Sequence, residues 1–293
     1  MEHFDVLIIG AGAAGMAAAY SAGKKGYRHI LIADRRDSYG GVLDQCVHNG
    51  FGLGYFKEDL TGIHYADRFH ELLIPYPLTF MFGTTVLKIK NDRTALLSGA
   101  AGAFFVSFDI CVLATGCRER TLYSLPVSGT RPAGIMTCGT AQRLINVDGL
   151  DIGDDIVIIG TGDVGQIMAR QLVQSGKNVI TMIEKESAPG GLKRNIENCI
   201  RAYSIPLMLN TEVVRISGKK RIEGVTVRNI SGEEKYIPCR LLLTAVGMIP
   251  ETELSDEAFG GEPLPEWFFK VGNCDYVHDI VDSVTLDGLK LWD

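Results

Sequence analysis

The sequence predicts an α/β fold built from two doubly wound, Rossmann-like dinucleotide-binding domains. An apolar strand runs into a G-x-G-x-x-G turn and a helix near residue 10, and the same pattern returns near residue 160. Gly makes up 34 of the 293 residues, well above the usual ~7%. Hydrophobic residues make up 46% and charged residues 22% of the chain. This composition is typical of a globular protein and excludes a disordered one.

Charge and cysteine content exclude several classes of protein. The net charge is −6 and we find no basic stripe, so we expect no nucleic-acid partner. Val6–Gly23 is uncharged, but its four glycines predict a strand, a turn and a helix instead of a membrane span. The N-terminus lacks the basic region of a signal peptide. Seven cysteines without C-x-x-C or C-x-x-x-x-C spacing predict a reduced, cytoplasmic protein with no bound metal.

The chain repeats itself with an offset of 150 residues. Residues 6–10 read V-L-I-I-G and residues 156–160 read I-V-I-I-G. The following residues recur at the same offset: Gly10, Gly12 and Gly15 as Gly160, Gly162 and Gly165, Asp34 as Glu184, and Gly40-Gly41 as Gly190-Gly191. The period is too long for a solenoid. It indicates two copies of one nucleotide-binding unit.

The spacing of the glycines in each copy predicts the local structure of a nucleotide-binding turn. The strands Asp5–Ile9 and Asp155–Ile159 lead into the helices Ala14–Gly23 and Val164–Gly176. The first Gly of each motif allows a tight turn, the second lets the backbone approach a pyrophosphate, and the third lets the helix pack on the strand. The helix N-terminus offers unpaired N–H groups to phosphate oxygens.

An acid follows each copy in the same register. The strands His29–Ala33 and Asn178–Ile183 end at Asp34 and Glu184, each 24 residues after the first Gly. A carboxylate there accepts hydrogen bonds from a ribose 2′-OH and repels a 2′-phosphate. Glu184 therefore favours NAD(H) over NADP(H), although Lys185 beside it weakens that signal.

Further segments carry a resemblance to a known family. Asp109–Gly116 reads D-I-C-V-L-A-T-G and Arg240–Gly247 reads R-L-L-L-T-A-V-G; Gly272-Asn273 precedes an expected helix over Tyr276–Val284. With the two G-x-G-x-x-G turns, these segments resemble the pyridine nucleotide-disulfide oxidoreductase superfamily, at thioredoxin-reductase-like size. The strings G-G-V-L-D-Q-C-V-H-N-G-F-G-L (40–53) and G-N-C-D-Y-V-H-D-I-V-D (272–282) resemble a branch that lacks the redox-active disulfide. Distant relatives are subunits of heteromeric amine, proline or opine dehydrogenases.

The resemblance implies the domain organisation. An FAD-binding domain is expected over residues 1–125 and 245–293, with an NAD(P)-binding domain inserted over 126–244. Hinges are expected at Pro126–Gly134 and Gly247–Pro250. We expect antiparallel strands around Thr84–Phe108 and over Glu212–Tyr236, and no separate dimerisation domain.

The motifs and the resemblance together imply two sets of cofactor-binding residues. The FAD set is Gly10, Gly12, Ala13, Ala14, Gly15, Asp34, Arg35, Gly41, Val42, Leu43, His48, Val86, Ala114, Thr115, Gly116, Gly272, Asn273, Asp279 and Ile280. The NAD(H) set is Gly160, Gly162, Asp163, Val164, Gly165 and Glu184. The helix after Gly272-Asn273 is implied to face the flavin ring with its N-terminus, which stabilises negative charge on reduced flavin.

Two candidate catalytic residues each have an alternative role. His48 has an ordinary pKa near ~6.5 that suits proton delivery, or it simply contacts the flavin. Cys46 is either a reactive thiolate or a small buried apolar side chain. Alignment of the glycines puts Leu43 and His48 where relatives carry a disulfide, and Cys138 has Ile135, not Cys, three residues upstream. Dithiol exchange requires two sulfurs, so the family's usual thiol chemistry is not expected.

The predicted function is that of an FAD-dependent oxidoreductase. A hydride passes between NAD(P)H and flavin, with electrons to or from a small-molecule acceptor or a partner flavoprotein. An alternative is a cofactor-binding subunit of a heteromeric dehydrogenase with little activity alone, and a third is a thiol-disulfide reductase using distant cysteines. A homodimer and a hetero-oligomer both stay open. An exposed apolar patch at Trp267–Phe269 or Trp292 would indicate a partner.

Overall fold

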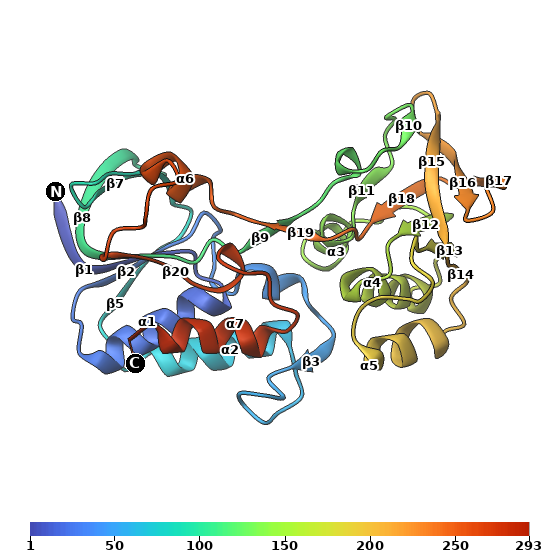
Figure 1. Ribbon diagram of the computed structural model, residues 1–293. Coiled ribbons are helices and arrows are strands. Elements are labelled where there is room, and N and C mark those ends of the chain that lie inside the picture. Colours follow the sequence, from blue (N-terminus) through green and yellow to red (C-terminus); the bar gives the residue numbers. More distant parts are fainter. Residues whose placement is uncertain (293) are drawn as a thin grey trace. The chain divides into compact units, whose positions relative to one another are not determined.

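The computed structural model describes residues 1–292 and divides into two compact units (Figure 1). One unit comprises Met1–Arg118 and Ile249–Asp293, and the other comprises Glu119–Met248. The two connections pass through strands β9 (Cys117–Glu119) and β19 (Met248–Pro250), which pair with each other. The divisions thus lie at 118/119 and 248/249, where the sequence placed them at 125/126 and 244/245.

The first unit is organised around a 7-stranded sheet of order β5-β2-β1-β8-β7-β6, with β20 also paired to β8. Its strands are β1 (Glu2–Ile9), β2 (Ile30–Ala33), β5 (Leu78–Met81), β6 (Thr85–Ile89), β7 (Thr94–Gly99), β8 (Gly102–Leu113) and β20 (Phe268–Lys270). β1 pairs in parallel with β2 and β8, whereas β6, β7 and β8 are antiparallel. The antiparallel segment expected around Thr84–Phe108 is confirmed.

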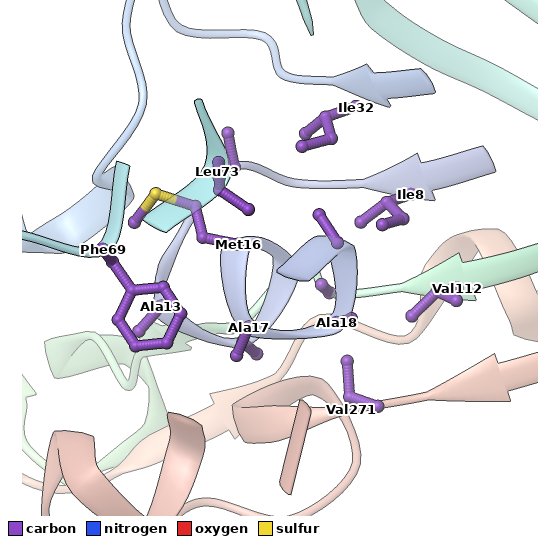
Figure 2. Packing of buried hydrophobic residues seen from close by; sticks show 14 of the residues in the cluster. Ile8, Ala13, Met16, Ala17, Ala18, Ile32, Phe69, Leu73, Val112 and Val271 are labelled. Carbon is purple, nitrogen blue, oxygen red and sulfur yellow. The ribbon is translucent and has the colours of Figure 1, made fainter. Parts of the chain in front are cut away.

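Helix α1 (Ala13–Lys25) packs on one face of this sheet. It is rich in alanine, and small side chains let a helix approach a sheet closely. Figure 2 shows Ala13, Met16, Ala17 and Ala18 of α1 beside Ile8, Ile32 and Val112 of the strands. The opposite face carries a second cluster that includes Leu7, Leu31 and Phe259 of helix α6 (Glu253–Phe259). The sheet is therefore buried on both faces, as a parallel sheet requires.

Two more helices lie beside α1. They are α2 (Gly62–Leu73) and α7 (Val281–Leu289), on the same side of the sheet as α1 (Figure 1). A short hairpin, β3 (Asn49–Phe51) with β4 (Leu60–Thr61), precedes α2. Short 3₁₀ turns occur at η1 (Gly41–Gln45), η4 (Gly272–Cys274) and η5 (Lys290–Trp292).

The expected start of the last helix was wrong by five residues. The sequence placed it at Tyr276, but α7 begins at Val281. Asn273 Oδ1 accepts the His278 N–H at 2.9 Å, and Ile280 is extended with φ −135° and ψ 148°. This local turn competes with the helix. As a result, Asp279 and Ile280 precede α7 instead of forming its first turn.

The second unit repeats the arrangement of the first. Its 5-stranded sheet has the order β11-β18-β12-β13-β14, from β11 (Ile135–Thr137), β12 (Ile156–Ile159), β13 (Val179–Ile183), β14 (Leu207–Met208) and β18 (Leu241–Thr244). The helices are α3 (Cys138–Asn146), α4 (Asp163–Gln174) and α5 (Lys193–Asn195), the last continuing as a π-helix, η3 (Ile196–Arg201). The path β14-β13-β12-β18 corresponds to β5-β2-β1-β8 of the first unit.

A separate, mostly antiparallel sheet completes the second unit, with β10 paired to β15 in parallel. Its order is β10-β15-β16-β17, from β10 (Ser128–Gly129), β15 (Thr211–Gly218), β16 (Ile222–Asn229) and β17 (Glu234–Pro238), and η2 (Leu122–Ser124) precedes it. β15 pairs with β16, and β16 with β17, in antiparallel register. The antiparallel segment expected over Glu212–Tyr236 is confirmed, and the two doubly wound units confirm the predicted α/β fold.

The tryptophans do not form the exposed apolar patch that would have indicated a partner. Trp267 is partly buried against the cluster that contains Phe108 and Phe259. Trp292 donates its indole N–H to the Ala18 carbonyl at 3.2 Å and packs on Tyr27. Both tryptophan side chains therefore pack against the hydrophobic clusters of the first unit.

Candidate dinucleotide sites

The first turn is shaped by two close backbone contacts. Gly10 has φ +110°, and a Cβ there would lie 2.4 Å from the Ala114 carbonyl oxygen. A Cβ on Gly15 would lie 1.9 Å from the Gly10 carbonyl oxygen. Neither position can carry a side chain, because these contacts are shorter than van der Waals distances and both neighbours are backbone. The first and third glycines thus let β1, β8 and α1 meet closely.

Gly12 has a different role, because a Cβ there would meet no heavy atom of residues 1–292 within 4 Å. Gly12 is the N-cap of α1, and no described side chain caps this helix end. No acidic residue lies in the first turn of α1. Ala13, Ala14 and Gly15 therefore present backbone N–H groups at a positive helix end with open space in front. A pyrophosphate fits this cradle.

The Asp34 carboxylate is fixed beside this turn. Oδ2 accepts the Ala11 N–H at 2.6 Å, and Oδ1 accepts the Arg36 N–H at 2.8 Å. Each carboxylate oxygen can accept a second hydrogen bond. Asp34 is therefore held in place and retains acceptor capacity for ribose hydroxyls.

A pocket of about 220 Å³ opens at the carboxyl ends of β1 and β2. It brings together five predicted residues: Gly10, Asp34, Arg35, Val86 and Thr115. The sequence did not predict the rest of its wall: Ile9, Ala33, Thr84, Thr85, Glu251, Glu253 and Leu254. The crevice at the carboxyl ends of strands is where ligands bind in doubly wound sheets.

Two acidic residues of the pocket wall, Glu251 and Glu253, form ion pairs with Arg118. Arg118 Nη1 lies 2.9 Å from Glu251 Oε2 and 2.5 Å from Glu253 Oε1, and these contacts raise the pKa of Arg118. Thr115 Oγ1 donates to the Glu251 carbonyl at 2.7 Å. Thr115 therefore joins the A-T-G turn to the pocket wall. Gly116 follows with φ +74°.

The loop at Gly40–Gln45 closes over the first turn. The Gly40 N–H donates to the Ala11 carbonyl at 2.9 Å, and a Cβ on Gly41 would lie 3.2 Å from Gly12 Cα. Leu43 is buried in the core, whereas Val42 is 61% exposed. Of the predicted loop residues, Gly41 and Val42 thus face the open side, and Leu43 offers only its backbone.

His48 and Cys46, the two catalytic candidates, lie in different surroundings. His48 is half-buried, its ring contacts Phe51 at 5.1 Å, and its Nδ1 donates to the Asn49 carbonyl at 2.9 Å. That bond puts the proton on Nδ1 when the ring is neutral. Cys46 is buried, which raises the pKa of its thiol to about 12. This burial opposes thiolate formation at Cys46, which favours the second of its two predicted roles, a small buried side chain.

The C-terminal segment returns to the first turn. A Cβ on Gly272, which has φ +68°, would lie 2.6 Å from the Ala14 Cβ. Asn273 uses its side chain internally, on the His278 N–H, and Asp279 is exposed. The sequence missed Asp282, which is 7% exposed and accepts the Gly54 and Tyr55 N–H groups at 3.0 Å each.

The second turn has the same geometry as the first. A Cβ on Gly160 would lie 2.2 Å from the Ala245 carbonyl oxygen, and a Cβ on Gly165 would lie 2.9 Å from the Ala245 Cβ. A Cβ on Gly162 would have the Ala245 carbonyl oxygen, at 3.9 Å, as its nearest described neighbour. Gly162 is the N-cap of α4, whose first turn contains Asp163, Val164 and Gly165. This helix end also suits a pyrophosphate.

Glu184 occupies the position of Asp34. Its Oε2 accepts the Thr161 N–H at 3.1 Å and the Thr161 hydroxyl at 2.6 Å, and Oε1 accepts the Glu186 N–H at 3.1 Å. Both acids thus accept the N–H of the residue after the first Gly. Residues that correspond at the offset of 150 positions therefore also form corresponding hydrogen bonds.

Comparison with known proteins decides the family. Residues 4–263 match the family described as pyridine nucleotide-disulphide oxidoreductase. The chain belongs to this family. Its members bind FAD and pyridine nucleotides and act as oxidoreductases, which agrees with the two dinucleotide turns described above.

Individual relatives are distant. An opine oxidase subunit of Rhizobium meliloti is 28% identical over 286 residues, which cover 88% of this chain and 52% of that protein. NADH dehydrogenase of Bacillus subtilis (strain 168) is 28% identical over 258 residues, covering 86% and 47% respectively. The chain therefore spans about half the length of these relatives. The crystal structure of T. acidophilum thioredoxin reductase superposes with a TM-score of 0.75 at 23% identity, covering 99% of this chain and 96% of that one.

Six of the seven cysteines of this pyridine nucleotide-disulphide oxidoreductase are buried, and Cys117 is half-buried. All seven lie in the described part of the chain, and none is in a disulfide. Burial raises the pKa of Cys138 well above its ordinary value, and the Glu119 carboxylate nearby acts in the same direction. Both Glu119 oxygens lie 2.9 Å from the Gly139 N–H, so a carboxylate caps α3 at this point. The environment of Cys138 opposes thiolate formation.

One cluster of potential metal ligands lies outside the two dinucleotide turns. His3, Asp5 and Asp109 have potential ligand atoms within 4.8 Å of one another. Asp5, however, already accepts the N–H groups of Arg28 and His29, at 2.8 and 3.0 Å.

Within residues 1–292, we find no helix with the length and apolar character needed to cross a bilayer.

Proposed function

We propose that this chain is an FAD-dependent oxidoreductase in which the first unit binds FAD and the second binds NAD(H). The observation that supports this most is the duplicated turn. Each copy has an open N-cap glycine, an uncapped helix end and a carboxylate held by the residue after the first Gly. Two such cradles in one chain suit one resident dinucleotide and one exchanging dinucleotide.

The assignment of FAD to the first unit rests on the pocket and the returning C-terminal segment. The pocket places Arg35 and Val86 beside Asp34, where an adenosine would lie. Gly272 approaches Ala14 from the other side, at the N-terminal end of α1. A ligand that runs from the pocket past Gly12 toward Gly272 would be bound along its whole length. Such an extended site favours tight, permanent binding.

The bound cofactors supply the chemistry, which is hydride transfer between the nicotinamide and the flavin. The chain binds and orients them. The N–H groups at Ala13–Gly15 and at Asp163–Gly165 hold the two pyrophosphates, and Asp34 and Glu184 accept ribose hydroxyls. We place His48 as a flavin-contact residue whose Nδ1–H is committed to the Asn49 carbonyl.

NAD(H) is proposed over NADP(H) because of Glu184. Its carboxylate lies at the ribose position of the second turn and accepts three protein hydrogen bonds that keep it there. A 2′-phosphate would place two like charges together, whereas a 2′-OH can donate to Oε1. Lys185 is 77% exposed in its side chain and lies 3.5 Å from Glu186, so its charge is partly compensated.

The electron acceptor is proposed to be a small molecule or a partner flavoprotein. A second candidate function, as one cofactor-binding component of a larger dehydrogenase, is favoured by the similarity to a protein named as an opine oxidase subunit. The two candidates differ in whether the chain turns over alone. A thiol-disulfide reductase is disfavoured, because burial raises the pKa of Cys46 and Cys138.

Anaerobic titration of the FAD-loaded protein with NADH tests the proposal. The expected result is loss of the visible flavin absorbance with one equivalent of NADH, and a much weaker response to NADPH. A yellow protein whose spectrum does not change with either nucleotide would reject the hydride step. Turnover with oxygen or quinones that appears only after mixing with a second flavoprotein would favour the role in a larger dehydrogenase.

A further inference from the structure

The two copies differ in chemistry at equivalent positions. The turn and helix of the first copy carry Ala11, Ala13 and Met16. At the offset of 150 residues, the second copy carries Thr161, Asp163 and Gln166. Three apolar side chains are thus replaced by three polar ones on the same framework. The difference lies under the loop that follows each acid, Gly40–Gln45 in the first copy and Gly190–Asn195 in the second.

In the second copy, all three polar side chains bind that loop. Thr161 Oγ1 accepts the Gly190 N–H at 2.9 Å, and Gln166 Nε2 donates to the Gly190 and Thr161 carbonyls at 2.7 Å each. Asp163 Oδ1 accepts the Leu192 N–H at 2.8 Å and the Asn195 amide at 2.7 Å. The loop is therefore attached to α4 by side-chain hydrogen bonds along its length.

The first copy holds its loop without side-chain hydrogen bonds from positions 11, 13 and 16, by backbone contact and apolar packing, and through Arg36, which donates to the Gly41 carbonyl at 2.7 Å and lies 3.8 Å from Asp44. The Gly40 N–H binds the Ala11 carbonyl, and Gly41 lies against Gly12. Met16 and Leu43 are buried in one apolar cluster. Apolar packing of this kind cannot be exchanged for water without cost, whereas hydrogen bonds can be exchanged for bonds to water at a small net cost.

The closed loop of the second copy also carries unfavourable features. Gln166 is fully buried, and within residues 1–292 its Oε1 has no hydrogen-bond partner. A buried acceptor without a donor destabilises the state that contains it. The loop continues through α5 into the π-helix Ile196–Arg201, and π-helical turns are uncommon and frequently occur at functional sites.

We propose that Thr161, Asp163 and Gln166 form a polar latch, through which the loop Gly190–Asn195 controls how fast the nicotinamide dinucleotide exchanges. This inference rests on the proposed function of the second unit. Asp163 is in the first turn of α4, where a negative charge opposes a bound anion. Its two donors hold it toward the loop. The second copy thus binds its dinucleotide weakly enough to release it at each turnover, while the apolar first copy retains FAD.

Three variants of the full-length, FAD-loaded protein test the latch. Asp163→Asn keeps an oxygen acceptor for Leu192 and Asn195 but removes the charge. NADH should then dissociate about twofold to fivefold more slowly, with a lower Kd. Asp163→Ala and Gln166→Met remove loop contacts without restoring the apolar packing of the first copy, because Lys193 stands where the first copy has Leu43. NADH should dissociate several-fold faster from Gln166→Met than from the wild type. It should also dissociate several-fold faster from Asp163→Ala than from Asp163→Asn, which lacks the same charge. Dissociation rates come from stopped-flow displacement of NADH, followed by its fluorescence.

The controls separate the latch from folding and from the proposed function. Asp151→Asn removes an exposed charge of the same unit that pairs with Lys177 and should leave the dissociation rate unchanged. FAD content and thermal unfolding should match the wild type in Asp163→Asn, which is nearly isosteric. Wild-type NADH binding with the same dissociation rate in all three latch variants would overturn the latch alone. No NADH binding by the wild type would reject the proposed function and the latch together.

Discussion

The backbone N–H of Ala11 donates a 2.6 Å hydrogen bond to Oδ2 of Asp34. This contact joins the turn between the first and second glycines to the end of the neighbouring strand. In the second unit, the Thr161 N–H makes the same bond to Glu184 at 3.1 Å. Each acid is thus positioned by the backbone of its own Gly-rich turn. Under the proposed function, this contact fixes the ribose and pyrophosphate positions of each site together.

Asp34→Ala is predicted to weaken FAD binding by about tenfold to a hundredfold, the loss expected for hydrogen bonds to a charged group. The variant also leaves the Ala11 N–H without its acceptor, so a lower midpoint of thermal unfolding is expected. FAD affinity is measured by reconstitution of the apoprotein. Asp37→Ala, an exposed acid three residues on, is the matched control. Equal FAD affinity in both variants would contradict the placement of Asp34 at the ribose.

Glu184→Ala is predicted to reduce the preference for NADH over NADPH. The loss of a ribose acceptor raises the Kd for NADH by about tenfold, while removal of a charge that repels a 2′-phosphate lowers the Kd for NADPH. The ratio of the two Kd values is the measurement. Glu223→Ala, which changes an exposed acid of the same unit outside this turn, should leave that ratio unchanged. An unchanged ratio in Glu184→Ala would remove the argument for NAD(H).

Asp282→Ala is predicted to destabilise the first unit by about 2–4 kcal/mol, because two hydrogen bonds to a buried carboxylate are lost. The effect should be local. Hydrogen exchange at the Gly54 and Tyr55 amides should accelerate most, since these groups donate to Asp282. Asp279→Ala changes a nearby exposed acid and should not alter exchange at these amides. Slow exchange that persists in Asp282→Ala would show that other contacts hold the loop.

Buried thiols are predicted to make the protein unstable at alkaline pH. The pKa of Cys46 is raised from 9.0 to about 12, and that of Cys239 to about 11. The unfolded chain loses these protons first, so stability is unaffected below pH 9 and falls as pH rises toward the folded-state values. The slope is about 1.4 kcal/mol per pH unit for each thiol. Denaturant unfolding at several pH values should give a shallower slope in Cys46→Ala than in the half-buried control Cys117→Ala, and equal slopes would contradict this account.

The elements predicted best were those encoded locally. Each G-x-G-x-x-G turn lies between an apolar run and a helix, and a few adjacent residues determine this geometry. Gly10 and Gly160 both have positive φ, which suits the tight turn predicted at the first Gly of each motif. The paired acids were also found, because their distance from the turn is constant along the chain.

Features that join distant segments could not be predicted. The Asp282 carboxylate accepts the Gly54 N–H although the two residues are 228 positions apart. Glu251, which follows β19, lines the same pocket as Gly10. No local pattern encodes such contacts. The start of α7 was missed because Asn273 forms a turn with the His278 N–H, which outweighs the helical pattern before Val281. The burial of Cys46 depends on packing with distant segments, so the sequence left both of its roles open.

The most direct test of the duplicated site compares Gly12→Ala with Gly162→Ala. Both glycines have backbone angles open to alanine, φ −78° and ψ −172° for Gly12 and φ −62° and ψ 167° for Gly162. A Cβ at either position meets little protein, so both variants should fold. We measure FAD content and NADH affinity in each. Gly12→Ala should lose FAD and still bind NADH, whereas Gly162→Ala should keep FAD and lose NADH. Variants that keep both ligands, or that lose the opposite one, would contradict the assignment of one dinucleotide to each turn.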